Sequence, residues 1–218
     1  MSTALKVVVS QRVEVLTEHG ERRDALDQRL CQWLIAAGCI PVPVPNALTT
    51  PVLVDHDQDL PGLQSWLLSV KADALVLSGG NDIGEAPERD NTERRLLAYA
   101  KDCDLPVLGI CRGMQMMAVW AGGSLTPVSG HVHTRHCFQA TTGTGVWPDE
   151  VNSFHNFALA DCPDGYIVTG RSEDGTIEAI RHEILPWEGW MWHPEREPQF
   201  SQIDVMRFRA LLDLRRAI

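Results

Sequence analysis

Short apolar runs alternate with longer amphipathic segments over the first half of the chain. Brief β-branched and aliphatic runs bounded by turn-forming residues are typical of buried strands, whereas apolar positions three and four apart are typical of helices. Strands that alternate with helices predict right-handed βαβ units around a mainly parallel sheet. The expected strands are 5–10, 40–44, 72–77 and 106–110. The strand 40–44 is expected at an edge of the sheet because of its prolines. The expected helices are 24–37, 61–70, 91–101 and 112–121.

The pattern changes after Gly122-Gly123, where short extended runs are separated by turn signals. Pro163-Asp164-Gly165 and Asp174-Gly175 are such signals, and they indicate antiparallel hairpins. We therefore expect one α/β domain over residues 1–218 with three layers: a mainly parallel central sheet, flanking helices and an antiparallel extension. The expected strands of the extension are 138–142, 166–171, 176–181 and 189–192, a last helix spans 202–216, and residues 11–21 and 46–60 are expected to be loops.

Composition and charge restrict the possible partners. The 218 residues carry a formal net charge of −10, which disfavours nonspecific binding to nucleic acid and to anionic membranes. The chain has no apolar run of membrane-spanning length, and its first residues lack a signal-peptide pattern. Six cysteines at irregular spacing are typical of reduced thiols. We expect a cytoplasmic protein that acts on a small molecule, with no nucleic acid or membrane partner; a homodimer stays possible.

The most informative segment joins the strand 106–110 to the helix that follows it. Cys111 stands between Gly109 and Gly113 in a G-x-C-x-G version of the nucleophile elbow, a tight turn that presents a reactive side chain above a sheet. The glycines permit close backbone approaches, and the unpaired N–H groups of the helix start favour a thiolate. The alternative is that Cys111 is a small buried hydrophobic residue. The two flanking glycines favour a nucleophile.

A nucleophilic cysteine needs a base, and the base needs an acceptor that orients it. His193-Pro194-Glu195 meets both needs if the segment is extended, because residues two apart then project to the same side. Glu195 would accept the Nδ1–H of His193 while Nε2 faces Cys111, and Pro194 restricts the backbone between them. The alternative is a histidine at a strand end beside a solvated glutamate. Together with the elbow, the pair favours a Cys–His–Glu triad.

The turn Ser78-Gly79-Gly80 follows the expected strand 72–77, and open α/β sheets place their binding crevice at the carboxyl ends of their strands. The N–H groups of Gly80 and of Arg112, which follows the cysteine, are candidates for holding a developing oxyanion. A glycine pair alone also marks an ordinary turn. The segment is not a phosphate loop, because the Walker lysine and the G-x-G-x-x-G spacing are absent.

Five motifs occur in an informative order. They are Ser78-Gly79-Gly80, Gly109-Ile110-Cys111-Arg112-Gly113-Met114-Gln115, Ala121-Gly122-Gly123, Val151-Asn152-Ser153-Phe154-His155 and His193-Pro194-Glu195. In this order they resemble class I glutamine amidotransferase domains, and most of all the free-standing γ-glutamyl hydrolases of peptidase family C26, which include γ-glutamyl-γ-aminobutyrate hydrolases. The resemblance implies a flavodoxin-like fold and a triad of Cys111, His193 and Glu195 that cleaves the γ-amide of glutamine or of a γ-glutamyl conjugate, without a cofactor.

The same resemblance implies that the glutamyl α-amino and α-carboxylate groups are held by Gln115 and by Asn152, Ser153, Phe154 and His155, with Gly79 also contacting the substrate. A zwitterionic group needs both donors and acceptors, which an amide side chain and exposed backbone supply. Without the resemblance, Gln115 would be an ordinary helix residue and His155 an ordinary loop histidine. A polar residue often occupies the position of Phe157 in this family, so contacts to the leaving group are expected to differ.

Arginines gather in the segments 10–13 and 20–29, where acidic residues offset them. One interpretation is a solvated helix start with surface ion pairs. The other is that Arg12 and one of Arg22 or Arg23 hold a phosphate, because this loop leaves the carboxyl end of the first strand. The segment resembles hydrolases of bacterial capsule phosphoramidate pathways, which release glutamate from γ-glutamyl-CDP-amidate. Arg12 is therefore a substrate-binding candidate.

Three histidines, His131, His133 and His136, have a spacing that permits metal ligation. A zinc site also needs a fourth ligand and acceptors behind the imidazoles. A polar loop beside the active site, in contact with the leaving group, explains these residues equally well. We therefore predict no metal.

The sequence predicts a cysteine-dependent hydrolase that releases glutamate and an amine through a γ-glutamyl thioester. The specific substrates expected are γ-glutamyl-CDP-amidate or another conjugate such as γ-glutamyl-γ-aminobutyrate. Two alternatives stay open: a glutaminase subunit that delivers ammonia to a separate synthetase, and a noncatalytic binding module on the same fold. The leaving-group amine cannot be identified from the residues.

Overall fold

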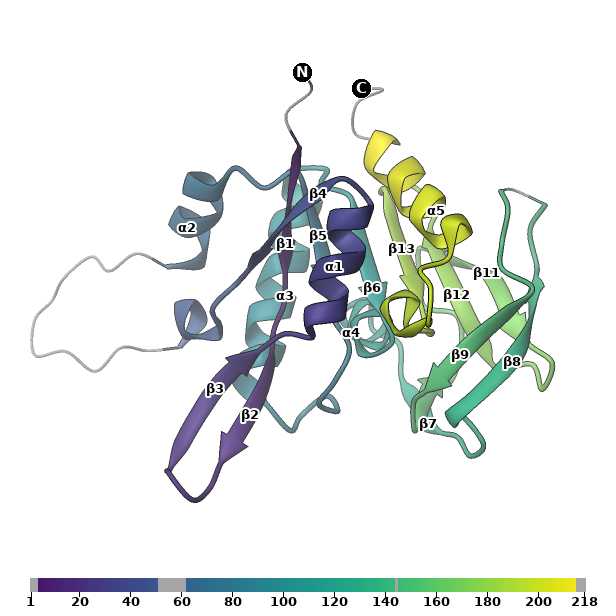
Figure 1. Cartoon of the computed structure of the whole chain (residues 1–218), viewed down its shortest axis with the longest axis horizontal. Coiled ribbons are helices and arrows are strands. Elements are labelled where there is room, and N and C mark those ends of the chain that lie inside the picture. The colour runs from purple at the N-terminus through teal and green to yellow at the C-terminus, as the bar shows by residue number, and fades with distance from the viewer. Residues whose placement is uncertain (1–3, 51–61, 144, 215–218) are drawn as a thin grey trace, which may run out of the picture.

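A nine-stranded mixed sheet with helices on both faces forms the centre of the computed structural model, which describes residues 4–50, 62–143 and 145–214 (Figure 1). The sheet order is β4-β1-β5-β6-β13-β12-β11-β8-β9. The first five strands run parallel to one another, and β12, β11, β8 and β9 continue the sheet as an antiparallel extension. The predicted fold class is confirmed, and so is the edge position of the proline-rich strand.

The sheet strands are β1 (Leu5–Val9), β4 (Cys39–Pro43), β5 (Ala74–Leu77), β6 (Val107–Ile110), β8 (Val132–Ala140), β9 (Glu150–Phe154), β11 (Tyr166–Ser172), β12 (Ile177–His182) and β13 (Trp187–Trp190). Two small ribbons pair β2 (Arg12–Leu16) with β3 (Glu21–Ala25) and β7 (Leu125–Pro127) with β10 (Phe157–Leu159). The helices are α1 (Gln28–Ala36), α2 (Leu63–Val70), α3 (Pro87–Asp102), α4 (Arg112–Trp120) and α5 (Gln202–Asp213), with 3-10 turns at Asn46–Thr49 and Pro194–Arg196.

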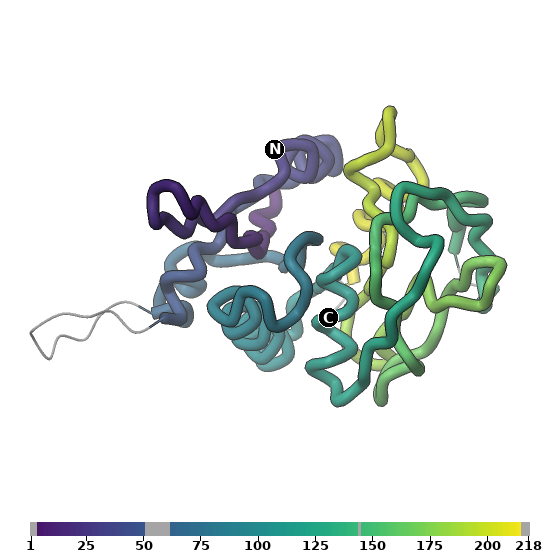
Figure 2. Tube along the Cα trace, turned by 90° about the horizontal axis from the view of Figure 1, so that it is seen from below, coloured from purple at the N-terminus to yellow at the C-terminus, as the bar shows by residue number. Residues whose placement is uncertain are grey.

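The alternation of side chains along the parallel strands builds two cores. Val7 and Val9 of β1 face one side of the sheet, and Val8 faces the other. Helices α1 and α5 cover the first side, while α2, α3 and α4 cover the second (Figures 1 and 2). The central strands β5 and β6 are apolar without interruption because both of their faces are buried.

The segment expected to be a loop at 11–21 is instead the β2–β3 hairpin, and the predicted helix 24–37 begins only at Gln28. From Arg12 to Val15, polar and apolar residues alternate with a period of two, which is a strand pattern. The many charged residues of the segment led to the prediction of a loop instead. Asp27 caps the helix, because its carboxylate accepts from the N–H of Arg29 at 2.9 Å. The interpretation of 20–29 as a helix start is therefore wrong.

The antiparallel extension also differs from the prediction. Strand β8 begins at Val132, earlier than expected, while β9, β7 and β10 were not predicted. The strand expected at 189–192 lies at Trp187–Trp190, so it ends three residues before His193 and not directly before it. The predicted loop at 46–60 contains a 3-10 turn at its start; residues 51–61 and 215–216 lie outside the described residues.

Three strands of the parallel half bring the predicted site together. Ser78 follows β5, Cys111 follows β6, and His193 comes three residues after β13. Because these strands are parallel neighbours, the segments after them meet at one edge of the sheet. Among the described residues, no helix has the length and apolarity needed to cross a membrane.

Two glycines allow α4 to start close against the sheet. A Cβ on Gly113 would overlap the carbonyl oxygen of Leu77 in β5, and a Cβ on Gly109 would lie 2.7 Å from the carbonyl carbon of Gly113. The groups in the way are backbone atoms, which cannot turn aside as a side chain can. The close approach that the G-x-C-x-G pattern predicts is therefore a property of this fold.

We expect Gly113→Ala to lower the free energy of unfolding by about 1–3 kcal/mol, the usual cost of an overpacked core. Urea denaturation followed by circular dichroism measures the change. Gly143→Ala is the matched control, because no described atom beyond its chain neighbours lies within 4 Å of that Cβ position. Equal stability of the two variants would contradict the proposed role of Gly113.

Candidate active site

Cys111 occupies a strained turn between β6 and α4. Its φ of 51° and ψ of −106° lie in a region that residues with a side chain rarely adopt. The Cys111 N–H donates to the carbonyl of Trp190 at 2.7 Å, and its carbonyl accepts from the N–H of Gln115 at 3.1 Å. The side chain is 6% exposed. This is the backbone geometry of a nucleophile elbow, and a cysteine that only filled space would not require it.

His193 and Glu195 form the pair that the sequence predicted, though by a different local geometry. The Nδ1 atom of His193 lies 2.7 Å from Oε1 of Glu195, and both side chains are buried. The pair does not stand in a strand, because Pro194 opens a 3-10 turn directly after His193. The turn brings the carboxylate back to the ring. The expectation of an extended segment is wrong, whereas the expected contact is present.

Asn152 of β9 holds the backbone of His193 from both sides. Its Oδ1 accepts from the His193 N–H at 3.0 Å, and its Nδ2 donates to the His193 carbonyl at 2.8 Å. Nδ2 also donates to Glu197 at 2.7 Å. Gly79 lies against the ring, where a Cβ would overlap Cε1 of His193. The imidazole is therefore fixed between the two halves of the sheet.

Charge around His193 outweighs the effect of its burial. Burial by itself lowers the pKa of the ring, but the Cys111 sulfur and the Glu195 carboxylate, which both interact with it, raise the pKa to about 9. The ring is consequently protonated at neutral pH. A protonated imidazole beside the sulfur is the arrangement that stabilises a thiolate.

One buried arginine binds the backbone of the turn after β5. Arg89 of α3 donates to the carbonyls of Ser78, at 2.6 Å, of Gly79, at 3.1 Å, and of Gly80. In a trans peptide the N–H points away from the C=O of the same unit. Carbonyls turned toward Arg89 therefore leave the N–H of Gly80 and that of the next residue directed away from it.

Arg89 belongs to a buried ion cluster that the sequence reasoning missed. Its Nε donates to Glu93 at 3.0 Å, and Glu93 and Asp90 both bind the guanidinium of Arg112 at the start of α4. Ser10 of the first βα segment donates to Glu93 at 2.7 Å. Burial lowers the pKa of Arg89 and of Arg112 to about 9, so both remain charged at neutral pH. The spacing of Arg89 and Glu93 was the one sequence signal, and it resembles an ordinary surface pair.

The backbone N–H of Arg112 belongs to the first residue of α4 and has no acceptor within the helix. The side chain of Arg112 points into the ion cluster instead of the crevice. Gly80, the other oxyanion candidate, has a φ of +89° and lies close to the side chain of Arg12. Both candidates thus offer backbone groups at the same sheet edge as Cys111.

The candidates for glutamyl contacts are largely engaged with the protein. Gln115 is buried and donates to the Phe157 carbonyl at 2.8 Å. The Ser153 hydroxyl donates to the His131 carbonyl at 2.7 Å. The ring of Phe154 stands edge-on to His193, with centroids 5.7 Å apart, and Arg196 lies over its face. His155 is buried, and its ring faces the protein interior near Glu178.

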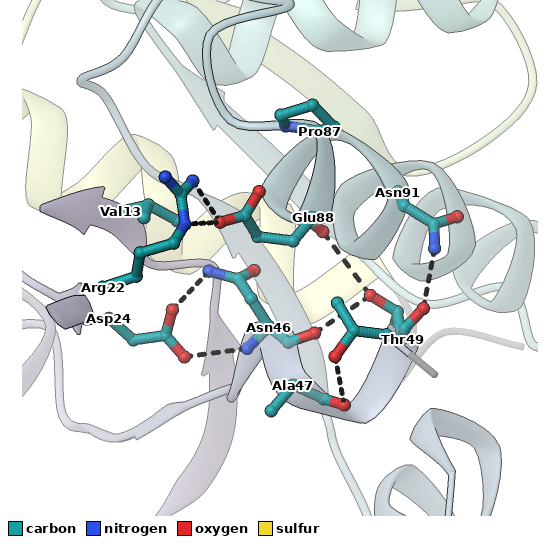
Figure 3. A pocket seen from close by; sticks show the side chains of 10 residues that line it. Val13, Arg22, Asp24, Asn46, Ala47, Thr49, Pro87, Glu88 and Asn91 are labelled. Atoms are coloured by element: carbon teal, nitrogen blue, oxygen red, sulfur yellow. Dashed lines mark hydrogen bonds and ion pairs between the residues drawn. The ribbon is translucent and has the colours of Figure 1, made fainter. Parts of the chain in front are cut away.

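Two cavities lie on opposite faces of the β2–β3 hairpin. A small one of about 20 Å³ is lined by Arg12, Gly79, His193 and Glu195, among others. A larger one of about 610 Å³ is lined by Val13, Arg22, Asp24, Asn46, Ala47, Thr49, Thr50, Pro87, Glu88 and Asn91 (Figure 3). Successive residues of a strand face opposite sides, so Arg12 faces the first cavity while Val13 faces the second.

This alternation separates the three candidate arginines. In the hairpin register, Glu14 opposes Arg23 on the face of Arg12, and Val15 opposes Arg22 on the other face. Arg22 donates to Glu88 at 2.8 Å across the larger cavity (Figure 3). Arg12 and Arg22 therefore do not converge on one phosphate. Arg12 and Arg23 share a face.

Comparisons with known proteins identify the family of this chain. The model of the family described as glutamine amidotransferase class-I matches residues 46–210, which is more than half of the chain. The chain belongs to the class-I glutamine amidotransferase family. The resemblance inferred from the motifs is confirmed, and with it the predicted class of enzyme, an amidohydrolase of this family.

Three curated relatives and one solved structure are informative. Gamma-glutamyl-CDP-amidate hydrolase of Campylobacter jejuni is 31% identical over 140 residues, or 62% of this chain and 68% of the relative. Gamma-glutamyl-gamma-aminobutyrate hydrolase of Escherichia coli O157:H7 is 29% identical over 206 residues, or 81% and 80%. One subunit of the glutamine-hydrolysing GMP synthase of Methanothrix thermoacetophila is 35% identical over 133 residues, or 58% and 68%. A Thermoplasma acidophilum structure described as a candidate GMP synthase subunit has a TM-score of 0.73 at 23% identity, covering 100% of this chain and 98% of that one, which shows the fold alone.

We expect the His193 ring to lose its proton near pH 9 in the native protein, and at lower pH in Cys111→Ser. The serine hydroxyl stays neutral, so burial then opposes the charged ring with only Glu195 to offset it. Nitrogen NMR of ring-labelled histidine measures both titrations, and His193→Asn assigns the signal. The same pKa in both proteins would exclude a charge interaction between Cys111 and His193.

Proposed function

We propose that this protein hydrolyses the γ-amide bond of a γ-glutamyl conjugate, releasing glutamate and an amine. The observation that carries the proposal is the position of Cys111 at a strained elbow, next to a protonated His193 that is itself bound to Glu195. Membership of the class-I glutamine amidotransferase family and relatives named as γ-glutamyl hydrolases support the same chemistry.

In the first half of the proposed reaction, the Cys111 thiolate attacks the γ-carbonyl carbon. The developing oxyanion accepts hydrogen bonds from the N–H groups of Gly80 and Arg112. The C–N bond then breaks as His193 transfers its Nε2 proton to the leaving nitrogen, which departs as a neutral amine. The product on the protein is a γ-glutamyl thioester at Cys111.

In the second half, neutral His193 takes a proton from water, and the resulting hydroxide attacks the thioester carbon. The C–S bond breaks, glutamate leaves, and the Cys111 thiolate and protonated His193 are restored. Glu195 holds the ring through its Nδ1 proton in both halves and stabilises its positive charge. Protons and charge balance over the cycle, so no cofactor is required.

The glutamyl end is proposed to bind at Gly79, Gln115 and the segment from Asn152 to His155. The side chains of Asn152 and Ser153 already have protein partners, so backbone groups of this segment are the better candidates. The amide of Gln115 donates to Phe157, which leaves its oxygen as an acceptor for the α-amino group. The Asn152 side chain acts as a positioning residue for His193.

The leaving group is proposed to lie along the hairpin face that carries Arg12 and Arg23. Arg12 is 37% exposed and lines the small cavity together with His193. Both arginines also have acidic neighbours, Glu14 and Glu21. A phosphate on the leaving group fits guanidinium donors, and the Campylobacter relative is named for a nucleotide amidate substrate. We therefore favour a phosphate-bearing γ-glutamyl amide, with γ-glutamyl-γ-aminobutyrate as the next candidate.

A second candidate function is a glutaminase subunit that supplies ammonia to a synthetase. The similarity to the Methanothrix protein favours it, because that relative is named as one subunit of a glutamine-hydrolysing GMP synthase. The two functions differ in their dependence on a partner. Turnover of γ-glutamyl conjugates by the purified chain supports the hydrolase, whereas glutamine hydrolysis that appears only with a synthetase supports the subunit.

We expect the purified protein to release glutamate from a panel of γ-glutamyl amides, and Cys111→Ala to reduce the rate by at least about 10⁴-fold while the fold is retained. Enzyme-coupled detection of glutamate measures the rate, and circular dichroism measures the fold. Mass spectrometry of acid-quenched samples is expected to detect a γ-glutamyl adduct on Cys111. Undiminished turnover by Cys111→Ala would exclude the mechanism.

We expect Arg12→Gln to lower kcat/KM about tenfold or more for a phosphate-bearing γ-glutamyl amide, since hydrogen bonds to charged groups contribute roughly 1.5–3 kcal/mol. The effect on γ-glutamyl-γ-aminobutyrate is expected to be smaller. Arg22→Gln is the matched control, because Arg22 faces the other side of the hairpin. Equal effects of the two variants, or no preference for phosphate, would overturn this part of the proposal.

A further inference from the structure

A second group of buried polar side chains lies within the antiparallel extension. It consists of His131, just before β8, His155, between β9 and β10, and Glu178 of β12. These side chains are at most 3% exposed. One nitrogen of each ring and one carboxylate oxygen all lie within 4.8 Å of one another. Two imidazoles and a carboxylate are a donor set that divalent transition metals prefer.

Each ring is oriented by an acceptor on its far side. Nδ1 of His155 lies 3.0 Å from the carbonyl oxygen of Phe157, which can only accept, so Nδ1 carries the proton. Nε2 of His131 lies 2.8 Å from Oδ2 of Asp174. In the neutral rings the lone pairs are then on Nδ1 of His131 and Nε2 of His155, which lie 3.7 and 3.6 Å from Oε1 of Glu178. Acceptors behind ligating histidines are a regular feature of metal sites.

The inward-facing atoms lack hydrogen bonds. Within the described part of the chain, neither oxygen of Glu178 has a hydrogen-bond partner, and the same holds for Nδ1 of His131 and Nε2 of His155. A fully buried carboxylate requires a neutralising group. The separations of 3.6 and 3.7 Å are too long for hydrogen bonds, but they are close to the distance between two ligands of one ion with bonds of about 2.0–2.2 Å.

We propose that His131, His155 and Glu178 bind one divalent transition-metal ion, with Zn²⁺ as the ion whose preferred donors they match. His136 is adjacent: its ring centroid lies 4.2 Å from that of His131, and its Nε2 also has no partner among the described residues. His136 is not among the donors that lie within 4.8 Å of one another, so the fourth position is left to a water. The sequence grouped His131 with His133 and His136; it assigned His155 to substrate binding and did not single out Glu178.

The site would act on structure and not on the reacting atoms. It joins the residues just before β8 and just after β9 to the second residue of β12. Strand β9 also carries Asn152, whose amide holds the backbone of His193. By holding β9 in place, the ion would also fix the position of Asn152 and, through it, the backbone of His193. Metal binding at this site does not depend on which substrate the protein hydrolyses.

The test measures Zn²⁺ binding by the full-length chain after treatment with a chelator. A Cys111→Ser background removes the thiol that competes for zinc beside His193. Titration in competition with a chromophoric zinc indicator measures stoichiometry and affinity, and Co²⁺ serves as an optical probe of the coordination. We expect one equivalent of tightly bound Zn²⁺ and a melting temperature that rises with its concentration.

Three variants in the same background locate the ion. Glu178→Gln preserves the shape of the side chain and is expected to abolish the stoichiometric binding. Asp174→Asn replaces the carboxylate behind His131, at a half-exposed position, by a neutral amide that is a weaker acceptor, and is expected to weaken binding about 10–100-fold. His133→Asn is the matched control, because His133 is an exposed histidine of the same segment and is expected to bind normally.

Absence of stoichiometric Zn²⁺ binding by folded Cys111→Ser protein would overturn the proposal. Binding that survives Glu178→Gln or Asp174→Asn unchanged would overturn it as well, since the ion would lie elsewhere. If Glu178→Gln does not fold, Asp174→Asn decides the question. Hydrolase activity is not the readout, so failure here is distinct from failure of the proposed function.

Discussion

The guanidinium of Arg89, buried under the turn that follows β5, is the contact on which the geometry of the site depends. It binds the carbonyls of Ser78, Gly79 and Gly80 and thereby sets the direction of their peptide units. Through Glu93 it is also linked to Arg112 at the start of α4. One ion cluster therefore fixes both backbone segments proposed to hold the oxyanion. Removing one partner of a buried charge pair typically lowers the free energy of unfolding by about 3–5 kcal/mol. Single substitutions within the cluster are therefore strongly destabilising.

The cluster also explains how a strained residue can persist. The backbone of Cys111 lies at an unfavourable φ and ψ, which costs of order 1–3 kcal/mol and persists only where the surroundings overdetermine it. The N–H of Cys111 is bound to Trp190 of β13, and the next residue is fixed by two carboxylates through its side chain. Gly113 then packs against Leu77 with no room for a side chain. The elbow is thus held by neighbours from β5, β13 and α3.

Local patterns predicted the parallel half of the sheet and the contact between His193 and Glu195, because apolar runs, glycine positions and sequence proximity encode them. They did not predict the β2–β3 hairpin, since charged residues on a two-stranded ribbon resemble a loop or a helix start. Arg89 and Glu178 could not be found either. Both are charged residues at fully buried positions. Glu178 meets His131 and His155 from distant segments, while Arg89 binds the nearby turn after β5 and Glu93 of its own helix. Burial of a charge depends on tertiary packing, which periodicity does not report.

Strand β13 joins the two halves of the molecule, since it is parallel to β6 on one side and antiparallel to β12 on the other. The segment after it therefore receives contacts from both halves: Gly79 packs on one side of the His193 ring, and Asn152 of the extension binds its backbone. Beside the ring, Gly79 leaves no room for even a methyl group. The position of His193, the proposed acid and base, therefore depends on how β8, β9 and β12 pack against one another. For this reason a buried group such as His131, His155 and Glu178 bears on the site although it touches none of the proposed reacting atoms.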